Sequence, residues 1–280
     1  MKFISCLVMA VAAMVTMSSC KIEKNVSNGE PKDYAVQVGK FNQIEVDVPC
    51  TVRFTQADNV GVKLRVEPND REKISVTTDN GVLYVRPVKQ RTRRGFLTFG
   101  DKGWDDDVEV IVSAPDLNKL LINSSGSFKA MNDLHLDGLD IRCAGSGEVD
   151  LKNVECNKSL QVSMDGAGEL DMQNLRCKQG FSFVSHGSGE MSAKSISASA
   201  ASFSIAGAGD VKSGMAHVGK TDVTIMGSGN VALSFNDCNQ ATISIMGSGD
   251  VALSGDLKTL SQHIAGAGNI DTSRLKLTGK

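Results

Sequence analysis

Apolar and polar residues alternate along most of the chain, in short segments that recur at a regular interval. Two aliphatic residues follow a glycine by two and four places, as Val231 and Leu233 do, and two more precede a glycine by four and two places, as Val223 and Ile225 do. A third, weaker pair lies seven and nine places after the glycine. Such alternation is typical of half-buried β-strands. Three short strands per interval predict one coil of a three-sided parallel β-helix, in which every coil pairs with its neighbours.

A Gly-(Ser/Ala)-Gly triplet, followed by Asp, Glu or Asn and then an aliphatic residue, sets this interval. Its copies begin at positions 145, 166, 187, 207, 227, 247 and 266, so the spacing is nearly constant. A repeat of this length indicates stacked structural units. We expect the glycines to form strand-to-strand corners, where the backbone needs a positive φ or leaves no room for a Cβ atom. The corner glycines are Gly145, Gly147, Gly166, Gly168, Gly187, Gly189, Gly207, Gly209, Gly227, Gly229, Gly247, Gly249, Gly266 and Gly268.

The part before the repeats, residues 34–118, contains no copy of the triplet but is rich in strand signals. Alternating segments at 44–48, 51–54, 62–66, 74–76, 82–85 and 108–112 are separated by turn residues. We expect a β-rich part that continues into the β-helix or caps its end, since an uncapped end exposes unpaired strand edges. The predicted fold is therefore all-β, with a parallel β-helix of about 20-residue coils over residues 119–280.

Residues 1–20 have the features of an export signal. Lys2 is followed by a short apolar stretch, and Met17, Ser18 and Ser19 precede Cys20 as in a bacterial lipobox. We expect cleavage before Cys20, lipidation of its thiol, and a polar tether over residues 21–33. An ordinary signal peptide that is cleaved nearby is the alternative. The prediction is an exported lipoprotein anchored on the outer membrane, at its periplasmic or its surface face.

Composition narrows the classes of function. The formal net charge is −2, which argues against a nucleic-acid partner. Cys156, Cys177 and Cys238 share one place in the repeat, which predicts an inward column of small apolar side chains. Cys156 and Cys177 fall on adjacent coils, so either two free thiols or a disulfide fits them. None of the cysteine spacings is typical of a zinc site.

Residues 88–107 interrupt the strand pattern. A basic cluster and aromatic residues precede three aspartates, and the candidate contact residues are Arg91, Arg93, Arg94, Phe96, Phe99 and Trp104. A long excursion between two strands is often functional. It fits an anionic glycan or a lipid headgroup, or it is a solvated hairpin extension whose opposite charges neutralise each other.

The residue after each triplet forms a second candidate site. If the coils stack in register, Glu148, Glu169, Glu190, Asp210 and Asp250 lie in one column with two asparagines, about 4.8 Å apart. A column of carboxylates either binds calcium or consists of solvated turn residues. No nucleophile or acid–base motif is present, so we expect no cofactor and a non-catalytic binding scaffold. A carbohydrate lyase or hydrolase that uses the acidic column is the alternative.

The strand block from Phe41 to Val48 with residues 82–85, and the glycine–acid repeats behind a lipobox, resemble the GIN-domain family over roughly residues 35–275. That family is labelled as a putative auto-transporter adhesin head domain and is common among lipoproteins of Bacteroidetes. The resemblance implies a right-handed parallel β-helix in the cell envelope, with a glycan or a surface protein as the partner besides the membrane. It supplies no catalytic residues, and we expect no translocator barrel from this sequence.

Overall fold

The computed structural model describes the backbone of residues 29–88, 90–92, 95–97 and 108–279, and the side chains of 29–88 and 108–279. The predicted signal segment with Cys20 and most of the tether lie outside this range, as do the side chains of the 88–107 excursion from residue 89 on. In the described ranges helical structure is confined to one turn of 3-10 helix, η1 (Arg71–Lys73). No helix in this part of the chain is long and apolar enough to cross a membrane.

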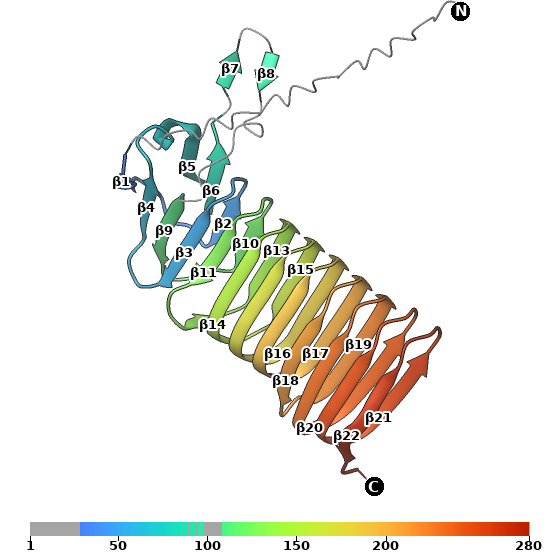
Figure 1. Cartoon of the computed structure of the whole chain (residues 1–280). Helices are drawn as coiled ribbons and strands as arrows, with labels where there is room; N and C mark the ends of the chain where they lie inside the picture. The colour runs from blue at the N-terminus through green and yellow to red at the C-terminus, as the bar shows by residue number, and fades with distance from the viewer. Residues whose placement is uncertain (1–28, 89, 93–94, 98–107, 280) are drawn as a thin grey trace, which may run out of the picture.

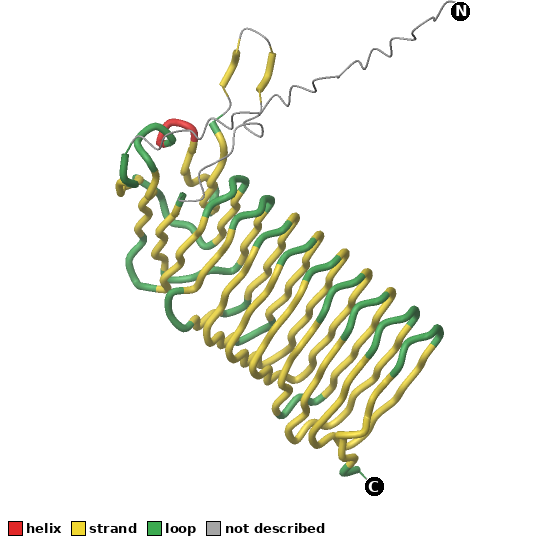
Figure 2. Tube along the Cα trace, viewed as in Figure 1, coloured by secondary structure: helices red, strands yellow, loops and turns green. Residues whose placement is uncertain are grey.

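The chain is all-β, as predicted, and forms a β-solenoid of about eight turns behind an N-terminal mixed sheet (Figure 1). The solenoid strands are β2 (Gln43–Val46), β3 (Thr51–Gln56), β10 (Lys119–Ile122), β11 (Ser127–Ala130), β12 (Leu134–Leu136), β13 (Leu139–Gly145), β14 (Glu148–Cys156), β15 (Leu160–Gly166), β16 (Glu169–Gly187), β17 (Glu190–Gly207), β18 (Val211–Ala216), β19 (Lys220–Gly227), β20 (Val231–Ile245), β21 (Val251–Ile264) and β22 (Ile270–Leu277). Figure 2 shows these strands stacked coil on coil.

Each coil pairs with the next through three segments. Residues 148–151 and 153–156 of β14 pair in parallel with β16, and residues 160–166 of β15 pair with its second half. We call the faces that these segments form the first, second and third face. Gly166 pairs with Gly187, Gly187 with Gly207, and Val251 with Ile270. The predicted three strands per coil are therefore present, with a repeat that shortens slightly along the stack.

The repeat pattern predicts that the parallel stack starts at residue 119. In the structure the stack already includes β2 and β3. Leu120 of β10 pairs with Ile44 of β2, and Phe128 of β11 pairs with Val52 of β3. The chain thus completes part of a coil, leaves the stack, and returns much later in the sequence to finish it. This confirms the expectation that the N-terminal part continues into the β-helix, although the corner between β2 and β3 contains Pro49 and Cys50 in place of a glycine triplet.

The segment before β2 and the excursion after β3 together build a cap on the N-terminal end. Its strands are β1 (Lys32–Val36), β4 (Gly61–Val66), β5 (Ile74–Asp79), β6 (Val82–Pro87) and β9 (Glu109–Ala114). Parallel β6 and β9 extend the ladders of β2 and β3, and antiparallel β5 and β4 then close them. β1 adds outside β4. Arg86 of β6 contacts Glu45 of β2 at 2.6 Å and lies over the ring of Tyr84.

The glycine triplets occupy corners between the third and first faces. The first glycine of every triplet has φ between +127° and +157°, a region that side chains strain. A Cβ atom at Gly207 would lie 2.1 Å from the carbonyl oxygen of Gly187, one coil earlier. The second glycines have ordinary φ values, yet a Cβ atom at Gly209 would lie 2.3 Å from the oxygen of Gly189. Backbone therefore packs directly on backbone at this edge of the solenoid.

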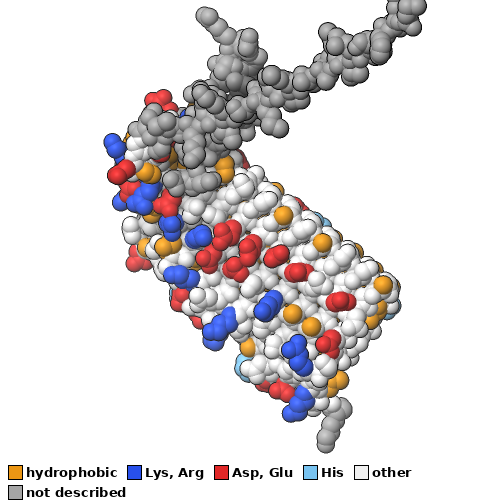
Figure 3. All heavy atoms as spheres, in the orientation of Figure 1, with side chains coloured by type: hydrophobic (Ala, Val, Ile, Leu, Met, Phe, Trp, Pro, Cys, Tyr) orange, Lys and Arg blue, Asp and Glu red, His pale blue; other side chains and the backbone are white. Residues whose placement is uncertain are grey.

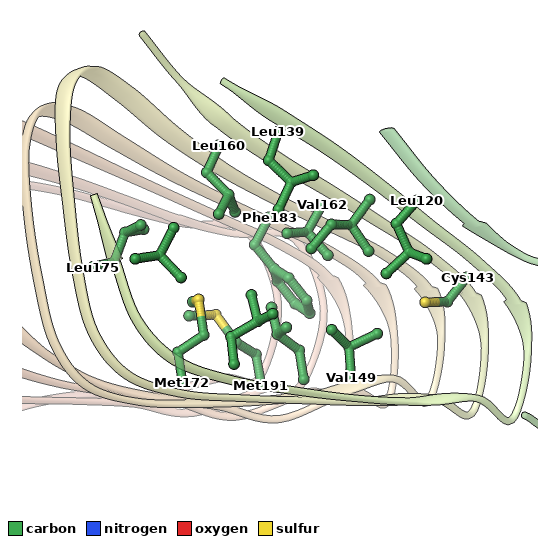
Figure 4. Packing of buried hydrophobic residues seen from close by; sticks show 14 of the residues in the cluster. Leu120, Leu139, Cys143, Val149, Leu160, Val162, Met172, Leu175, Phe183 and Met191 are labelled. Atoms are coloured by element: carbon green, nitrogen blue, oxygen red, sulfur yellow. The ribbon is translucent and has the colours of Figure 1, made fainter. Parts of the chain in front are cut away.

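Aliphatic, aromatic and thiol side chains fill the interior of the coils. Figure 4 shows Leu160, Phe183, Met172 and Met191 converging on the space that the ribbon encloses. The five cysteines in the described part of the chain are buried and free, with Cys156 and Cys177 as partners on adjacent coils. Burial raises the pKa of the Cys50 and Cys143 thiols to about 12, so these thiols behave as small apolar groups.

Replacing Gly207 by Ala should destabilise the solenoid by more than about 1 kcal/mol, since the new Cβ meets backbone and φ is +143°. Ala208→Ser is the matched control, because other triplets carry serine at that place. Urea denaturation followed by circular dichroism measures both. Equal stability of G207A and the native protein would contradict the packing of these corners.

Candidate functional site

The outward residues of the first face change character along the stack. In the middle coils they are acidic: Glu148 and Asp150 pair in register with Glu169 and Asp171, and Glu190 follows Glu169. Lys129 borders this group, with its Nζ atom 3.4 Å from the Glu148 carboxylate. Figure 3 shows acidic side chains gathered over the middle of the visible face. We call Glu148, Asp150, Glu169, Asp171 and Glu190 the acidic patch.

Glu169 is at the centre of the acidic patch, and the pKa of its carboxyl is raised. The charge of Asp171 contributes most to this shift, followed by burial and by the charges of Glu190 and Glu148. The carboxylates are outward-facing and solvated, so water and salt screen much of this repulsion. The patch is a strained arrangement of like charges rather than a buried acid.

The column formed by the residue after each triplet continues into the C-terminal coils, where aspartates alternate with asparagines. Asp210, Asn230, Asp250 and Asn269 follow one another, and each backbone N–H of the last three donates to the side chain one coil earlier, at 2.9, 3.3 and 3.0 Å. The Asn230 amide also donates to Asp210 Oδ1 at 3.0 Å. Every carboxylate therefore has a neutral neighbour on the next coil.

The alternation of aspartate and asparagine weakens the case for calcium binding by this column. One oxygen of Asp210 and one of Asp250 already accept backbone hydrogen bonds. Among the described residues no group of three or more His, Cys, Asp and Glu side chains has an arrangement that could hold a metal ion. The asparagines remove the repulsion that a bound cation would otherwise have to relieve.

A shallow groove runs along the first face over the C-terminal coils. Two adjoining hollows, of about 540 and 580 Å³, share Ser192, Lys212, Ala232 and Ala252. These four residues are partners on successive coils, so small side chains form most of the floor. The groove reaches from Glu169 and Met172 at one end to Asp271 and Arg274 at the other.

The sides of the groove are polar on both edges. The Asp210–Asn269 column forms one edge, and the other consists of Gln173, Lys194, Gly214, Ser234 and Ser254. Lys212 stands on the floor between Ser192 and Ala232. No aromatic residue lines either hollow. The arrangement presents hydrogen-bonding groups and both signs of charge to an elongated partner.

The groove was not predicted from the sequence, although a signal was available. At the third place after the triplet, Asp150 and Asp171 give way to Ser192, Lys212, Ala232 and Ala252, before Asp271 returns in the last copy. The three small residues at this place mark where the face becomes hollow, and Lys212 stands between them. The acidic column was predicted as a set, and the structure does place its members on successive coils.

The 88–107 excursion and the histidines add little to the described surface of the candidate site. In the 88–107 excursion, β7 (Gln90–Thr92) and β8 (Gly95–Leu97) pair in the antiparallel sense, with Arg91 opposite Phe96. The side chains of its candidate residues lie outside the described range. Three exposed histidines each contact an acid one coil away, as His186 contacts Asp165 at 2.9 Å.

These features define the class of protein. A capped β-solenoid with a polar groove along one flank is an elongated repeat protein with an extended contact face. Residues 40–214 and 213–278 match the family described as "Putative auto-transporter adhesin, head GIN domain". Because these matches cover most of the chain, it belongs to that family, as the resemblance of its repeats indicated.

Solved structures of three proteins share the fold. A protein of Parabacteroides distasonis named a putative lipid binding protein is 22% identical, with a TM-score of 0.73 over 88% of this chain and 97% of its own. A putative adhesin of the same species is 19% identical (TM-score 0.71) and one of Bacteroides fragilis is 20% identical (0.59), each over 88% of this chain and 98% of its own. At these identities the likeness establishes the fold alone. A search of curated proteins found no match.

Glu169→Gln should raise the stability at pH 7 by about 0.3 kcal/mol, because it removes exposed like-charge repulsion. The raised pKa means that the folded protein binds the proton more tightly than the unfolded chain, so this carboxyl stabilises at acidic pH and destabilises as the pH rises through its folded pKa. The gain should therefore vanish near pH 3 and shrink in about 1 M salt.

Glu155→Gln is the matched control for this measurement. Glu155 is exposed on the same stack but lies opposite Arg176 and 3.3 Å from His135, so its removal loses attraction instead of repulsion. Thermal melts at pH 3 and 7, at low and high salt, compare the two variants. A gain for E155Q as large as that for E169Q would contradict the role of the acidic patch.

Proposed function

We propose that this chain is a non-catalytic, adhesin-like scaffold of the cell envelope, held on the membrane by a lipid at Cys20. Its family is one of adhesins by description, which implies an exported cell-surface protein. The observation that carries the proposal is the groove on the first face. It extends over several rigid coils, so a partner contacts many equivalent positions at once.

The chemistry of the groove favours a polar, elongated partner. Its floor of serine and alanine leaves room for a chain to lie flat, while the Asp–Asn column offers acceptors and amides at intervals of about 4.8 Å. Lys212 on the floor and Arg274 at one end of the groove supply positive charge. A glycan chain is the partner class that we test first, and an extended segment of a surface protein is the second.

One observation favours the rival function, glycan cleavage on the acidic column. Glu169 lines the groove, and its pKa is raised mainly by the charge of Asp171. A general acid of a glycosidase usually owes its raised pKa to an apolar, buried setting. Glu169 is exposed, and like charges around it are the main cause. This difference supports a binding role over an acid–base role.

An array of glycans and immobilised surface proteins, read together with a reducing-sugar assay, tests the proposed function. We expect binding without product, and loss of binding in Ala232→Phe, which fills the groove floor. Ala206→Phe, an outward residue on the third face beside exposed Met226, is the matched control and should bind normally. Turnover that Glu169→Gln or Asp210→Asn abolishes would establish the rival instead.

Deleting residues 89–106 separates the groove from the excursion as the contact site. If the groove binds the partner, this deletion should leave the array signal unchanged while A232F removes it. The reverse result would transfer the site to the excursion, and binding unaffected by both changes would overturn both assignments.

Lipidation is tested by Cys20→Ala. The small residues before Cys20 and the polar stretch after it predict that this variant loses palmitate labelling and is released from membranes. Metabolic labelling and membrane fractionation measure the two effects. Persistent labelling of C20A would show that the anchor is elsewhere.

A further inference from the structure

The C-terminal end of the solenoid differs from the N-terminal end in having an open ladder. β22 pairs with β21 and with no other strand in the described part of the chain. Ile264 and Leu277 continue the inward rows of Ile245 and Leu257, which are fully buried, yet they are 43% and 55% exposed. An apolar end with unpaired backbone groups is a template for another strand.

The other end shows what closes this ladder. β22 extends the row that runs back through β14, β11 and β3 to β9. There the row is closed by β4, which pairs with β9 in the antiparallel sense. An antiparallel strand therefore fits the end of this row, and the C-terminal end has none among the described residues.

We propose that a second copy of this chain closes the C-terminal end, with the two β22 strands paired antiparallel about a two-fold axis between Ser273 and Arg274. A two-fold axis places any edge strand antiparallel to its own copy, which is the isologous arrangement of most homodimers. Each copy thereby supplies an antiparallel closing strand to the β22 edge of the other.

The inward and outward pattern of β22 fits this axis. A register shift opposite Leu253 leaves two successive residues, Ser273 and Arg274, exposed in the middle of the strand. On either side the pattern is symmetric: Thr272 and Leu275 are half-buried, and Ile270 and Leu277 continue inward rows. In the proposed register inward residues therefore face inward ones, Thr272 opposite Leu275 and Ile270 opposite Leu277. Registers shifted by one or two residues place an inward residue opposite an outward one.

The charges of the strand are complementary in the same register. Asp271 and Lys276 are both exposed and lie at equal distances from the axis. Asp271 of each copy therefore faces Lys276 of the other, which forms two equivalent ion pairs. Opposite charges at facing positions stabilise antiparallel pairs.

Sedimentation of the full chain in a density-matched detergent tests the proposal. We expect the native protein to have twice the mass of a single chain. Asp271→Lys and Lys276→Asp should each weaken self-association at least tenfold, because each places like charges opposite one another. The double variant with both changes should recover the dimer, since the ion pairs return with their signs exchanged.

Asp165→Lys is the matched control, as it reverses an exposed acid far from β22 and should leave the dimer unchanged. Thermal melts establish that all four variants are folded. A native protein that remains monomeric, a D271K variant that still dimerises, or a double variant that fails to recover would each overturn the proposal.

Discussion

Direct stacking of backbone on backbone at the glycine corners is the constraint on which the rest of the molecule depends. The amide of Ser228 donates to the carbonyl of Gly207 at 2.8 Å, and the equivalent bond recurs at the other triplets from Gly166 onward. This contact leaves no space for a Cβ atom, and it fixes each coil in register with the one before. Because the register is fixed, every side chain lies beside its counterpart one repeat away.

Because the register is fixed, residues at the same place in successive repeats contact one another as neighbours in a row. Apolar rows gain from it, as the buried rows of valine and isoleucine show. In rows of like charge the neighbours repel one another, and the first face contains two arrangements of such rows. Asn230 separates Asp210 from Asp250, whereas Glu148, Glu169 and Glu190 stand in direct succession. The pKa of Glu169 is raised there, first by the charge of Asp171 and then by burial and the charges of Glu190 and Glu148.

The sequence predicts the features that the repeated residue pattern encodes, and it predicts much less of those that occur once. The triplets and the alternating aliphatic residues predict the solenoid and its three segments, because each coil repeats the same local rules. The N-terminal part was expected to continue or cap the β-helix, but its register with β10 and β11 was not predicted, because Pro49 and Cys50 turn its corner and four of the five cap strands are inserted between β3 and β10. The acidic column follows from the sequence, but the groove depends on how far small side chains such as Ala232 and Ala252 stand below their neighbours.

The interruption between β3 and β10 has a consequence for the order in which the molecule folds. Pairing β3 with β11 joins Val52 to Phe128, whereas a later coil closes over a much shorter loop, as from Phe203 to Val223. Loop-closure entropy makes the first of these steps costlier by about 1.2 kcal/mol. Strands β6 and β9 of the cap pair with β2 and β3 inside that loop, so forming the cap first shortens the loop that remains to be closed. The later coils all close over short loops of nearly equal length, so each adds to the edge of the one before at a similar entropic cost.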